Sequence, residues 1–357
     1  MKVLAVLSGK GGVGKTTTVS NLSAALTTEF GKYVIGIDGN VTTPNLGLHL
    51  GIFSFPHTLN DVLNGVIPLR EAIYTCSNGV RIIPANLSFD SSDVDLTVMR
   101  NSLNELDADL VLIDSCPGLG NEIVPTLKIT DEALIVTNPE IPAITDAFRA
   151  IEIVGRYNVP VRGVILNRVR KDKYELSVTE VESIFDLPVI SVIPEDSSVR
   201  EGIFLGNPVV MTQPFSPAAI EFKRLAGYLI DEKYRVSSID RLKWFFGRIF
   251  KKSKSTWRSP EAPVILERLV ETPSVTEKPP EEAPKKPEPS ENDHLGSKLA
   301  SLRIKKDVME AALDGLEKKF REGQVDKDLY IKLKDKYISE LESHRTELAK
   351  VESGIDK

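Results

Sequence analysis

The chain has few cysteines and histidines, the residues that cross-link small extracellular domains or bind structural metals. Its 357 residues contain 2 cysteines and 4 histidines, too few for a disulfide framework or a four-cysteine zinc site. No apolar run approaches the roughly 18 residues of a membrane-spanning helix, and the apolar stretch at the N-terminus is too short for a secretory signal. The net charge of −6 is not that of a globally basic nucleic-acid binder. We therefore expect a cytosolic protein without a structural metal.

Short apolar runs and amphipathic stretches alternate over residues 1–232. The chain is longer than one ordinary domain, and its 41% hydrophobic residues suffice for a buried core. Short continuous apolar runs are typical of parallel strands covered on both faces, and helical patterns over Thr17–Phe30 and Ala143–Tyr157 lie between them. The pattern predicts an α/β domain with a doubly wound, mostly parallel sheet. The expected strands are Val3–Leu7, Val34–Ile37, Val80–Ile83, Leu110–Ile113, Ala133–Val136 and Val161–Leu166.

Three segments of different composition follow this domain. Residues 238–254 combine bases with aromatic residues, residues 258–293 are rich in proline and glutamate, and residues 295–353 return to a helical pattern. The proline- and glutamate-rich stretch cannot bury enough apolar surface to offset its ordering entropy, so we expect a disordered linker. In the last segment Gly323 is a helix stop and Asp326 an N-cap between two apolar-periodic runs. This predicts a coiled-coil-like helical hairpin that serves interaction or oligomerisation.

A glycine-rich loop follows the first expected strand directly. Residues 9–16 fit the pattern G-x-x-x-x-G-K-[ST] and open a helix. Glycines let successive backbone N–H groups turn inward around an anion, and the helix N-terminus adds its dipole. Lys15 would place a positive charge on the β- and γ-phosphates, and the Thr16 hydroxyl would be a ligand of Mg²⁺. The sequence therefore predicts a nucleotide site made of Gly9, Lys10, Gly11, Gly12, Val13, Gly14, Lys15, Thr16 and Thr17.

The loop contains a second lysine, Lys10, directly after its first glycine. Residues 10–17 read KGGVGKTT, and the sequence here resembles the MinD/ParA family of deviant Walker A ATPases, whose motif is KGGxGK[ST]T. The resemblance implies a P-loop fold, ATP and Mg²⁺ as cofactors, and a homodimer in which Lys10 reaches the ATP of the partner subunit. It covers roughly residues 1–232 and does not extend beyond Trp257.

Further motifs carry the same resemblance. VIGIDGN is similar to the family's second strand and switch I, with Asp38 close to Mg²⁺. DLVLIDSCPGLG is similar to its Walker B strand and switch II, with Asp114 at the end of the strand, and VTNPEIPAITDAFRAI is close to the MinD branch. By the same resemblance, GVILNRV and IPEDSSVREG imply contacts with the adenine from Asn167, Arg168, Pro194 and Asp196.

One position departs from the family pattern. Two residues after Asp38 the family usually has an aspartate that helps to position the attacking water, and this chain has Asn40. An amide can hydrogen-bond a water but has no negative charge, so we expect intact nucleotide binding and slow hydrolysis. Two alternatives stay open: a modest loss of rate, since phosphoryl transfer relies on positioning and electrostatics, or a hydrolysis-poor switch or scaffold. The predicted catalytic residues are Lys10, Lys15, Asn40 and Asp114, and the predicted metal ligands are Thr16 and Asp38.

The cysteines and histidines have no ligand spacing. Cys116 has no C-x-x-C partner, so we interpret it as a small buried thiol. This weighs against the iron–sulfur carrier relatives of the family, which use paired cysteines. We assign no role to the four scattered histidines.

Residues 238–254 separate into two faces on a helical wheel. The large apolar residues fall within an arc of about 140°, at about 100° per residue, and the bases occupy most of the remainder. A basic helix with bulky apolar residues lies in a bilayer interface, with its bases at anionic headgroups, and the MinD branch ends in such a helix. The alternatives are a last domain helix packed on the sheet, and a nucleic-acid patch, which would place its aromatics between the bases. The apolar arc contains Ile239, Leu242, Phe245, Phe246, Ile249 and Phe250.

Together these features predict a MinD-like ATPase that forms a homodimer with ATP and associates with the inner face of the cell membrane. Its expected role is the spatial positioning of cell division or of another polar machine. An unknown protein partner would bind through the C-terminal hairpin, and no specific nucleic acid is expected. The competing function is a ParA-type DNA-partitioning ATPase, which would show exposed bases on the ATPase domain.

Overall fold

The computed structural model describes residues 1–235, apart from residues 42, 53–54, 77, 86–95, 105 and 119, together with residues 327–352 and several positions between 303 and 321. The predicted membrane segment, residues 238–254, and the predicted linker, residues 258–293, lie outside the described residues. So does much of the first half of the predicted hairpin.

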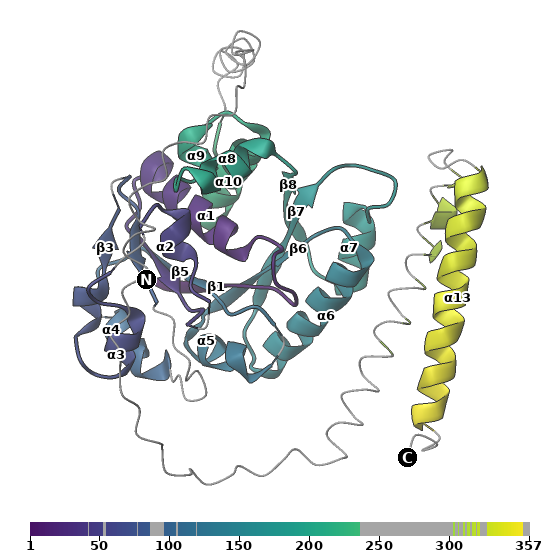
Figure 1. The fold of residues 1–357 in the computed structure, drawn as a ribbon, viewed down its shortest axis with the longest axis horizontal. Helices are drawn as coiled ribbons and strands as arrows, with labels where there is room; N and C mark the ends of the chain where they lie inside the picture. Colours follow the sequence, from purple (N-terminus) through teal and green to yellow (C-terminus); the bar gives the residue numbers. More distant parts are fainter. Residues whose placement is uncertain are drawn as a thin grey trace, which may run out of the picture.

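A single eight-stranded sheet organises residues 1–235 (Figure 1). Its order is β3-β4-β2-β5-β1-β6-β7-β8, and every neighbouring pair is parallel except β3–β4. The prediction of a mostly parallel α/β sheet is confirmed, and each expected strand overlaps an observed one. The strands are β1 (Lys2–Leu7), β2 (Val34–Asp38), β3 (Tyr74–Thr75), β4 (Arg81–Ile83), β5 (Leu110–Asp114), β6 (Glu132–Thr137), β7 (Val161–Val169) and β8 (Val189–Pro194).

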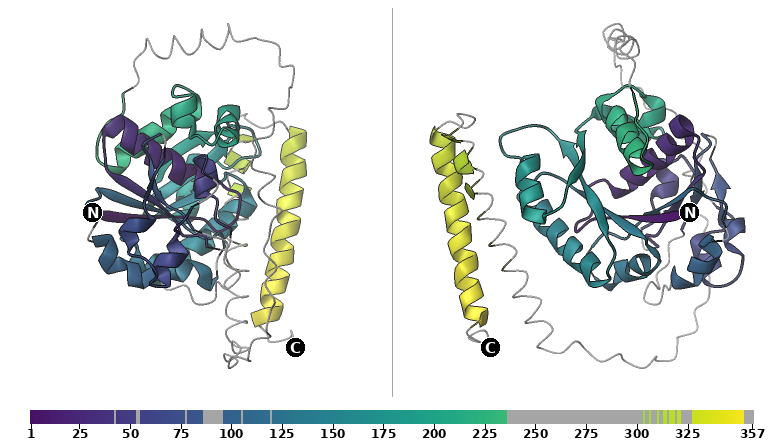
Figure 2. Two further views of the ribbon diagram at one scale, coloured as in Figure 1. Left: turned by 60° about the vertical axis from the view of Figure 1, so that its left-hand side comes forward. Right: turned by 180° about the vertical axis from the view of Figure 1, so that it is seen from behind.

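Helices cover both faces of the sheet (Figures 1 and 2). Figure 1 shows α1, α2, α8, α9 and α10 on one side and α3 to α7 on the other. The helices of these two layers are α1 (Lys15–Phe30), α2 (Leu46–His49), α3 (Leu59–Leu63), α4 (Met99–Asn104), α5 (Val124–Ile129), α6 (Ile141–Arg156), α7 (Val178–Phe185), α8 (Ser197–Phe204), α9 (Val209–Thr212) and α10 (Pro217–Leu229), with 3₁₀ turns η1 (Leu69–Ala72), η2 (Leu96–Val98) and η3 (Asn121–Ile123).

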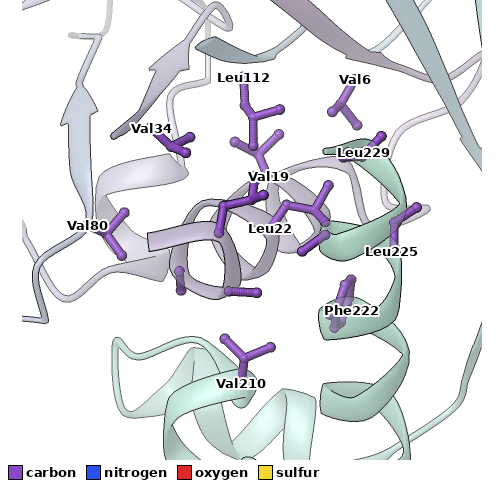
Figure 3. Close-up of a cluster of buried hydrophobic side chains, with 14 of the residues drawn as sticks. Val6, Val19, Leu22, Val34, Val80, Leu112, Val210, Phe222, Leu225 and Leu229 are labelled. Carbon is purple, nitrogen blue, oxygen red and sulfur yellow. The ribbon is translucent and has the colours of Figure 1, made fainter. Parts of the chain in front are cut away.

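The buried strands contribute to hydrophobic cores on both faces of the sheet, because side chains alternate along a strand. In β1, Leu4 and Val6 pack against α1 and α10, while Ala5 and Leu7 pack against α5 and α6. Figure 3 shows the first of these cores, where side chains of α1 meet Phe222 of α10. All of β1, β2 and β5 except the first residue of β1 is buried, which is why these strands read as continuous apolar runs.

The carboxyl ends of the parallel strands meet at one edge of the sheet. β1 leads into the glycine-rich loop and α1, β2 ends at Asp38, and β5 ends at Asp114 directly opposite Asp38. In open α/β sheets this edge is where ligands bind.

Residues 231–235, the last described residues of the α/β unit, fold back onto α1 and α10. The Lys223 ammonium, with 2% of its side chain exposed, pairs with Glu29 at 2.6 Å and lies 5.4 Å from the centre of the Tyr234 ring. That ring meets Phe30 edge-on at 6.4 Å, and Glu232 pairs with Lys32 at 2.9 Å. Glu232 and Tyr234 therefore lie beside the C-terminal end of α1.

Near the C-terminus, α13 (Lys327–Glu352) is a continuous helix (Figure 2). The Phe320 and Tyr330 rings stack with centroids 4.1 Å apart, Glu317 pairs with Lys334 at 3.0 Å, and Glu310 binds Arg345 at 2.6 Å. Two antiparallel segments would make these contacts; the hairpin over residues 295–353 itself stays a prediction. No helix among the described residues is both long and apolar enough to span a bilayer.

Candidate functional site

The glycine-rich loop joins β1 to α1. Gly12 and Gly14 adopt left-handed φ angles of 78° and 108°, which side-chain-bearing residues rarely adopt. The Lys15 ammonium donates a hydrogen bond to Ser8 Oγ at 2.8 Å, and Ser8 Oγ donates to the Lys10 carbonyl at 2.7 Å. Burial lowers the pKa of Lys15, while the charge of Asp114 opposes that shift.

Two glycines of the loop are required by close packing. A Cβ at Gly9 would lie 1.9 Å from the Asp146 carbonyl oxygen of α6, and one at Gly14 would lie 2.1 Å from Asn167 Nδ2. Asn167, at the end of β7, donates from Nδ2 to the Val13 carbonyl at 2.7 Å and is 5% exposed. The sequence indicated an adenine contact for Asn167; the structure places its side chain against the phosphate loop, and the adenine contact stays a prediction.

The predicted metal ligands, Thr16 and Asp38, both neighbour Asp114. The Thr16 hydroxyl donates to Asp114 Oδ2 at 2.6 Å. Asp38 Oδ2 accepts the backbone amides of Asn45 at 3.0 Å and Leu46 at 2.9 Å. Burial raises the pKa of Asp38, and the neighbouring Asp114 charge raises it further; burial also raises the pKa of Asp114.

This group fits a divalent cation. Asp114 Oδ1 is buried and has no hydrogen-bond partner within the described residues, and an unpartnered buried carboxylate oxygen is costly unless a positive charge faces it. A hydroxyl and carboxylates are the ligands that Mg²⁺ prefers. Thr16, Asp38 and Asp114 would hold the ion directly or through water, beside the phosphates of a nucleotide. Among the described residues, no cluster of three or more histidine, cysteine or acidic side chains forms another metal site.

The Asn40 side chain is hydrogen-bonded within its own loop, which we call switch I and define as residues 38–46. Its Nδ2 donates to the Thr43 carbonyl and to Thr43 Oγ1, both at 2.9 Å, and its Oδ1 accepts the Thr43 amide at 3.2 Å. The Asn40 amide N–H donates to Asp38 Oδ1 at 3.2 Å. The side chain therefore braces switch I in this structure, and its catalytic role stays a prediction.

A turn after β5, which we call switch II and define as residues 114–122, contacts switch I and the phosphate loop. The Gly39 amide donates to the Asp114 carbonyl at 2.9 Å, and the Cys116 thiol donates to the Gly39 carbonyl at 3.4 Å. A Cβ at Gly11 would lie 3.7 Å from Pro117 Cβ. Cys116 is 5% exposed, as predicted for a buried thiol, and burial, followed by the charge of Glu122, raises its pKa to about 11.

His49 is a contact that the sequence did not indicate. Its Nδ1 lies 3.0 Å from the Asn45 carbonyl and its Nε2 lies 3.5 Å from Thr17 Oγ1. A tautomer with the proton on Nδ1 donates to Asn45 and can accept from Thr17. Burial lowers the pKa of His49, which favours this neutral form. The imidazole thereby links switch I to the start of α1.

The remaining predicted residues lie at the same edge of the sheet. Lys10 is exposed, and Arg168 is exposed with a left-handed φ of 57°. Pro194 ends β8. Asp196 caps helices, because its Oδ1 accepts the Ser198 amide at 2.9 Å and its Oδ2 accepts the Ala218 amide at 3.2 Å. The adenine contacts of Arg168, Pro194 and Asp196 stay predictions.

The fold and the loop define a P-loop nucleotide-binding protein. The ParA family described as "NUBPL iron-transfer P-loop NTPase" matches residues 1–230. An uncharacterized ATP-binding protein of Methanocaldococcus jannaschii is 37% identical over 252 residues, which are 70% of this chain and 95% of that protein. The chain therefore belongs to the MinD/ParA family of P-loop ATPases.

Solved structures of MinD proteins resemble the same part of the chain. The septum site-determining protein MinD of Pyrococcus horikoshii, complexed with Mg-ADP, is 34% identical with a TM-score of 0.60, over 64% of this chain and 95% of that one. The MinC:MinD cell division complex of Aquifex aeolicus contains a chain that is 30% identical with a TM-score of 0.60, over 66% and 98%. Roughly the last third of the chain lies outside these matches.

Proposed function

We propose that this chain is a slow ATPase that dimerises around ATP and Mg²⁺ and takes part in spatial positioning at the inner face of the cell membrane. The contrast between its two loop lysines carries the proposal. Lys15 is 7% exposed and bonded to Ser8, whereas Lys10 is exposed and its ammonium has no bonding partner in the described part of the chain. A cation presented outward from its own cradle is available to the nucleotide of a second copy.

The roles of the site residues follow from their positions. The loop amides and Lys15 bind the phosphates, and the hydrogen bond from Asn167 to the Val13 carbonyl holds the loop. Thr16, Asp38 and Asp114 hold Mg²⁺, which neutralises charge on the phosphates when bound. Asn40 adds no negative charge near the attacking water, and its amide is bound to Thr43, so we expect low turnover.

The proposed role in cell division is supported by the relatives of this chain, and the proposed membrane contact is supported by its sequence. Relatives similar to residues 1–230 include proteins named MinD, and one solved MinD is complexed with MinC. Residues 240–254 contain six bases and one acid, the balance of an interfacial helix on anionic lipid. Residues 295–353 would offer a helical surface to a protein partner.

Two variants of the loop test the central claim. Lys15→Ala is expected to abolish ATP binding, because the positive charge at the phosphates is lost. Lys10→Ala is expected to keep ATP binding by the monomer and to lose the ATP-dependent dimer. Isothermal titration with ATP and multi-angle light scattering with and without ATP measure the two effects. If the Lys10→Ala variant forms the ATP-dependent dimer to the same extent as the parent, the proposal is wrong.

A DNA-partitioning function is the second candidate, and one surface favours it. Arg168 near the end of β7 and Arg170 and Lys171 directly after it are exposed, at the same edge of the sheet as the phosphate loop. Glu175 holds this loop in shape by accepting the amides of Arg170 at 2.9 Å and Lys171 at 2.8 Å. ATP-dependent retardation of DNA that falls steeply with salt and is lost in Arg170→Glu, without pelleting on anionic liposomes, would favour this function.

A further inference from the structure

His49 contacts both of the segments that carry the predicted Mg²⁺ ligands. Thr16 belongs to the first turn of α1, and Asp38 is the first residue of switch I. The short helix α2 directly follows switch I and packs beside α1 (Figure 1). The half-buried side chain of His49, the last residue of α2, meets switch I at Asn45 and α1 at Thr17.

The contact with switch I is a hydrogen bond to the turn that holds Asp38. His49 Nδ1 lies 3.0 Å from the Asn45 carbonyl oxygen, which also accepts the His49 backbone amide at 3.1 Å. Because a carbonyl oxygen only accepts, Nδ1 carries the proton of this bond. The backbone amides of Asn45 and Leu46 in turn donate to Asp38 Oδ2 at 3.0 Å and 2.9 Å. Asn45 is therefore held at its N–H by the Asp38 carboxylate and at its carbonyl by His49.

The contact with α1 reaches the residue next to a predicted metal ligand. His49 Nε2 lies 3.5 Å from Thr17 Oγ1, and in the neutral imidazole this nitrogen accepts from the hydroxyl. Thr17 is 8% exposed and directly follows Thr16, whose hydroxyl donates to Asp114 Oδ2 at 2.6 Å. The imidazole thus spans from the start of α1 to the turn around Asp38.

The orientation of α2 depends on such contacts because the helix is very short. It has 4 residues, and isolated helices shorter than about 12 residues are marginal in water. Leu46 is fully buried and anchors the first turn in the core, but apolar burial has no direction. The hydrogen bond from His49 does have a direction, and it orients the Asn45 peptide whose N–H donates to Asp38.

We propose that His49 is a positioning residue of the nucleotide site, which holds Asp38 in place for Mg²⁺ and thereby sets the Mg²⁺ dependence of nucleotide binding. It acts through Asn45 and is not itself a metal ligand. This inference rests on the Mg²⁺–nucleotide site of the proposed function and deepens it. It requires neither hydrolysis nor dimerisation nor a membrane, so it can be tested by nucleotide binding alone.

His49→Leu and His49→Asn separate the hydrogen bond from the packing of the side chain. Leucine fills space and has no donor, whereas asparagine can donate to the carbonyl four residues earlier, as Asn21 Nδ2 does to the Thr17 carbonyl at 2.8 Å. In the full chain, His49→Leu should raise the Mg²⁺ concentration for half-maximal ADP binding by about three- to tenfold, the effect of one net hydrogen bond on an equilibrium constant. The ADP affinity in EDTA should change by less than about twofold, because the phosphate loop keeps its own contacts. His49→Asn should stay within about twofold of the parent in both measurements.

Three controls show whether a loss comes from folding. His57→Leu, the same change at a histidine outside switch I and α2, should leave the Mg²⁺ dependence unchanged. Thermal unfolding of the nucleotide-free chain in EDTA shows that each variant is folded. His49→Met, which is flexible and apolar, has the same expected result as His49→Leu and replaces it if the leucine variant does not fold.

The outcomes separate this inference from the proposed function. If the parent needs Mg²⁺ for tight ADP binding and His49→Leu needs no more of it, the role of His49 alone is wrong. Equal losses of ADP affinity with Mg²⁺ and in EDTA, or a His49→Asn variant that behaves like His49→Leu, also overturn it, because packing and not the hydrogen bond then matters. A parent whose ADP affinity does not respond to Mg²⁺ overturns the metal site of the proposed function, and this inference with it.

Discussion

Replacing Asn167 by alanine should both destabilise the domain and loosen the phosphate loop. The substitution removes the donor to the Val13 backbone carbonyl, a bond of 2.7 Å between residues that are 5% and 2% exposed. A buried carbonyl left without its partner costs about 1–3 kcal/mol. For a domain of this size each kcal/mol lowers Tm by roughly 2–4 °C, so a fall of several degrees is expected.

The same variant distinguishes a loop brace from a base contact. Because the Asn167 amide packs against Gly14 and Val13, its loss should weaken ATP and GTP binding by similar factors. The assays are thermal unfolding followed by circular dichroism and titration with both nucleotides. Asn101→Ala, at an exposed position of α4, serves as the control. An Asn167→Ala variant with unchanged Tm that loses only its preference for adenine would refute the reasoning, and would place the side chain at the base.

Three further predictions concern the switch, the tail and the base of the sheet. Asn40→Asp should raise steady-state phosphate release severalfold by adding a charge near the water, and should lower Tm because the donor to Thr43 is lost; unchanged or lower release would contradict it. Phe246→Glu should abolish ATP-dependent pelleting with anionic liposomes and leave ATP affinity intact, because two tails on a dimer bind with an avidity gain of about 10²–10⁴; equal pelleting with ADP and ATP would count against a membrane role. Burial tends to raise the pKa of Asp131, but hydrogen bonds from Arg100 and the Val3 amide outweigh it and lower that pKa below its ordinary value. The stabilisation is therefore present above the unfolded pKa of about 4 and lost as pH falls below it. Asp131→Asn should be less stable than the parent at pH 7, with the difference shrinking in acid urea titrations; a constant difference would contradict this.

The elements that the sequence predicted well are those with a period or a fixed motif. Each expected strand overlaps an observed one, since a strand buried on both faces is a continuous apolar run. β8 was missed because its burial alternates and Ser191 interrupts its apolar residues. The phosphate loop was predictable because each of its positions has a separate chemical reason.

Contacts between single polar residues far apart in the chain could not be predicted. Asn167 meets Val13 because β7 and β1 lie on either side of β6, an order that no spacing encodes. His49 is near Thr17 only because the short helix α2 packs on α1. Asp196 fits the family's base-binding loop, and its role as a cap of two helices emerges only when α10 is beside α8. Such residues have no signal in one sequence beyond their polarity.

The fold-back of residues 231–235 fixes where the ATPase domain can be cut or extended. A chain shortened to end at Ile230 would lose the Tyr234 ring from beside Phe30 and Lys223, and with it the cover over a nearly buried ammonium. A chain ending at Arg235 keeps that cover. Lys15 and Phe30 are the first and last residues of α1, which rises about 1.5 Å per residue, so the contact of Tyr234 with Phe30 lies about 22 Å along the helix from Lys15. A fluorescent protein or surface tether fused after residue 235 would therefore leave the path of the nucleotide clear.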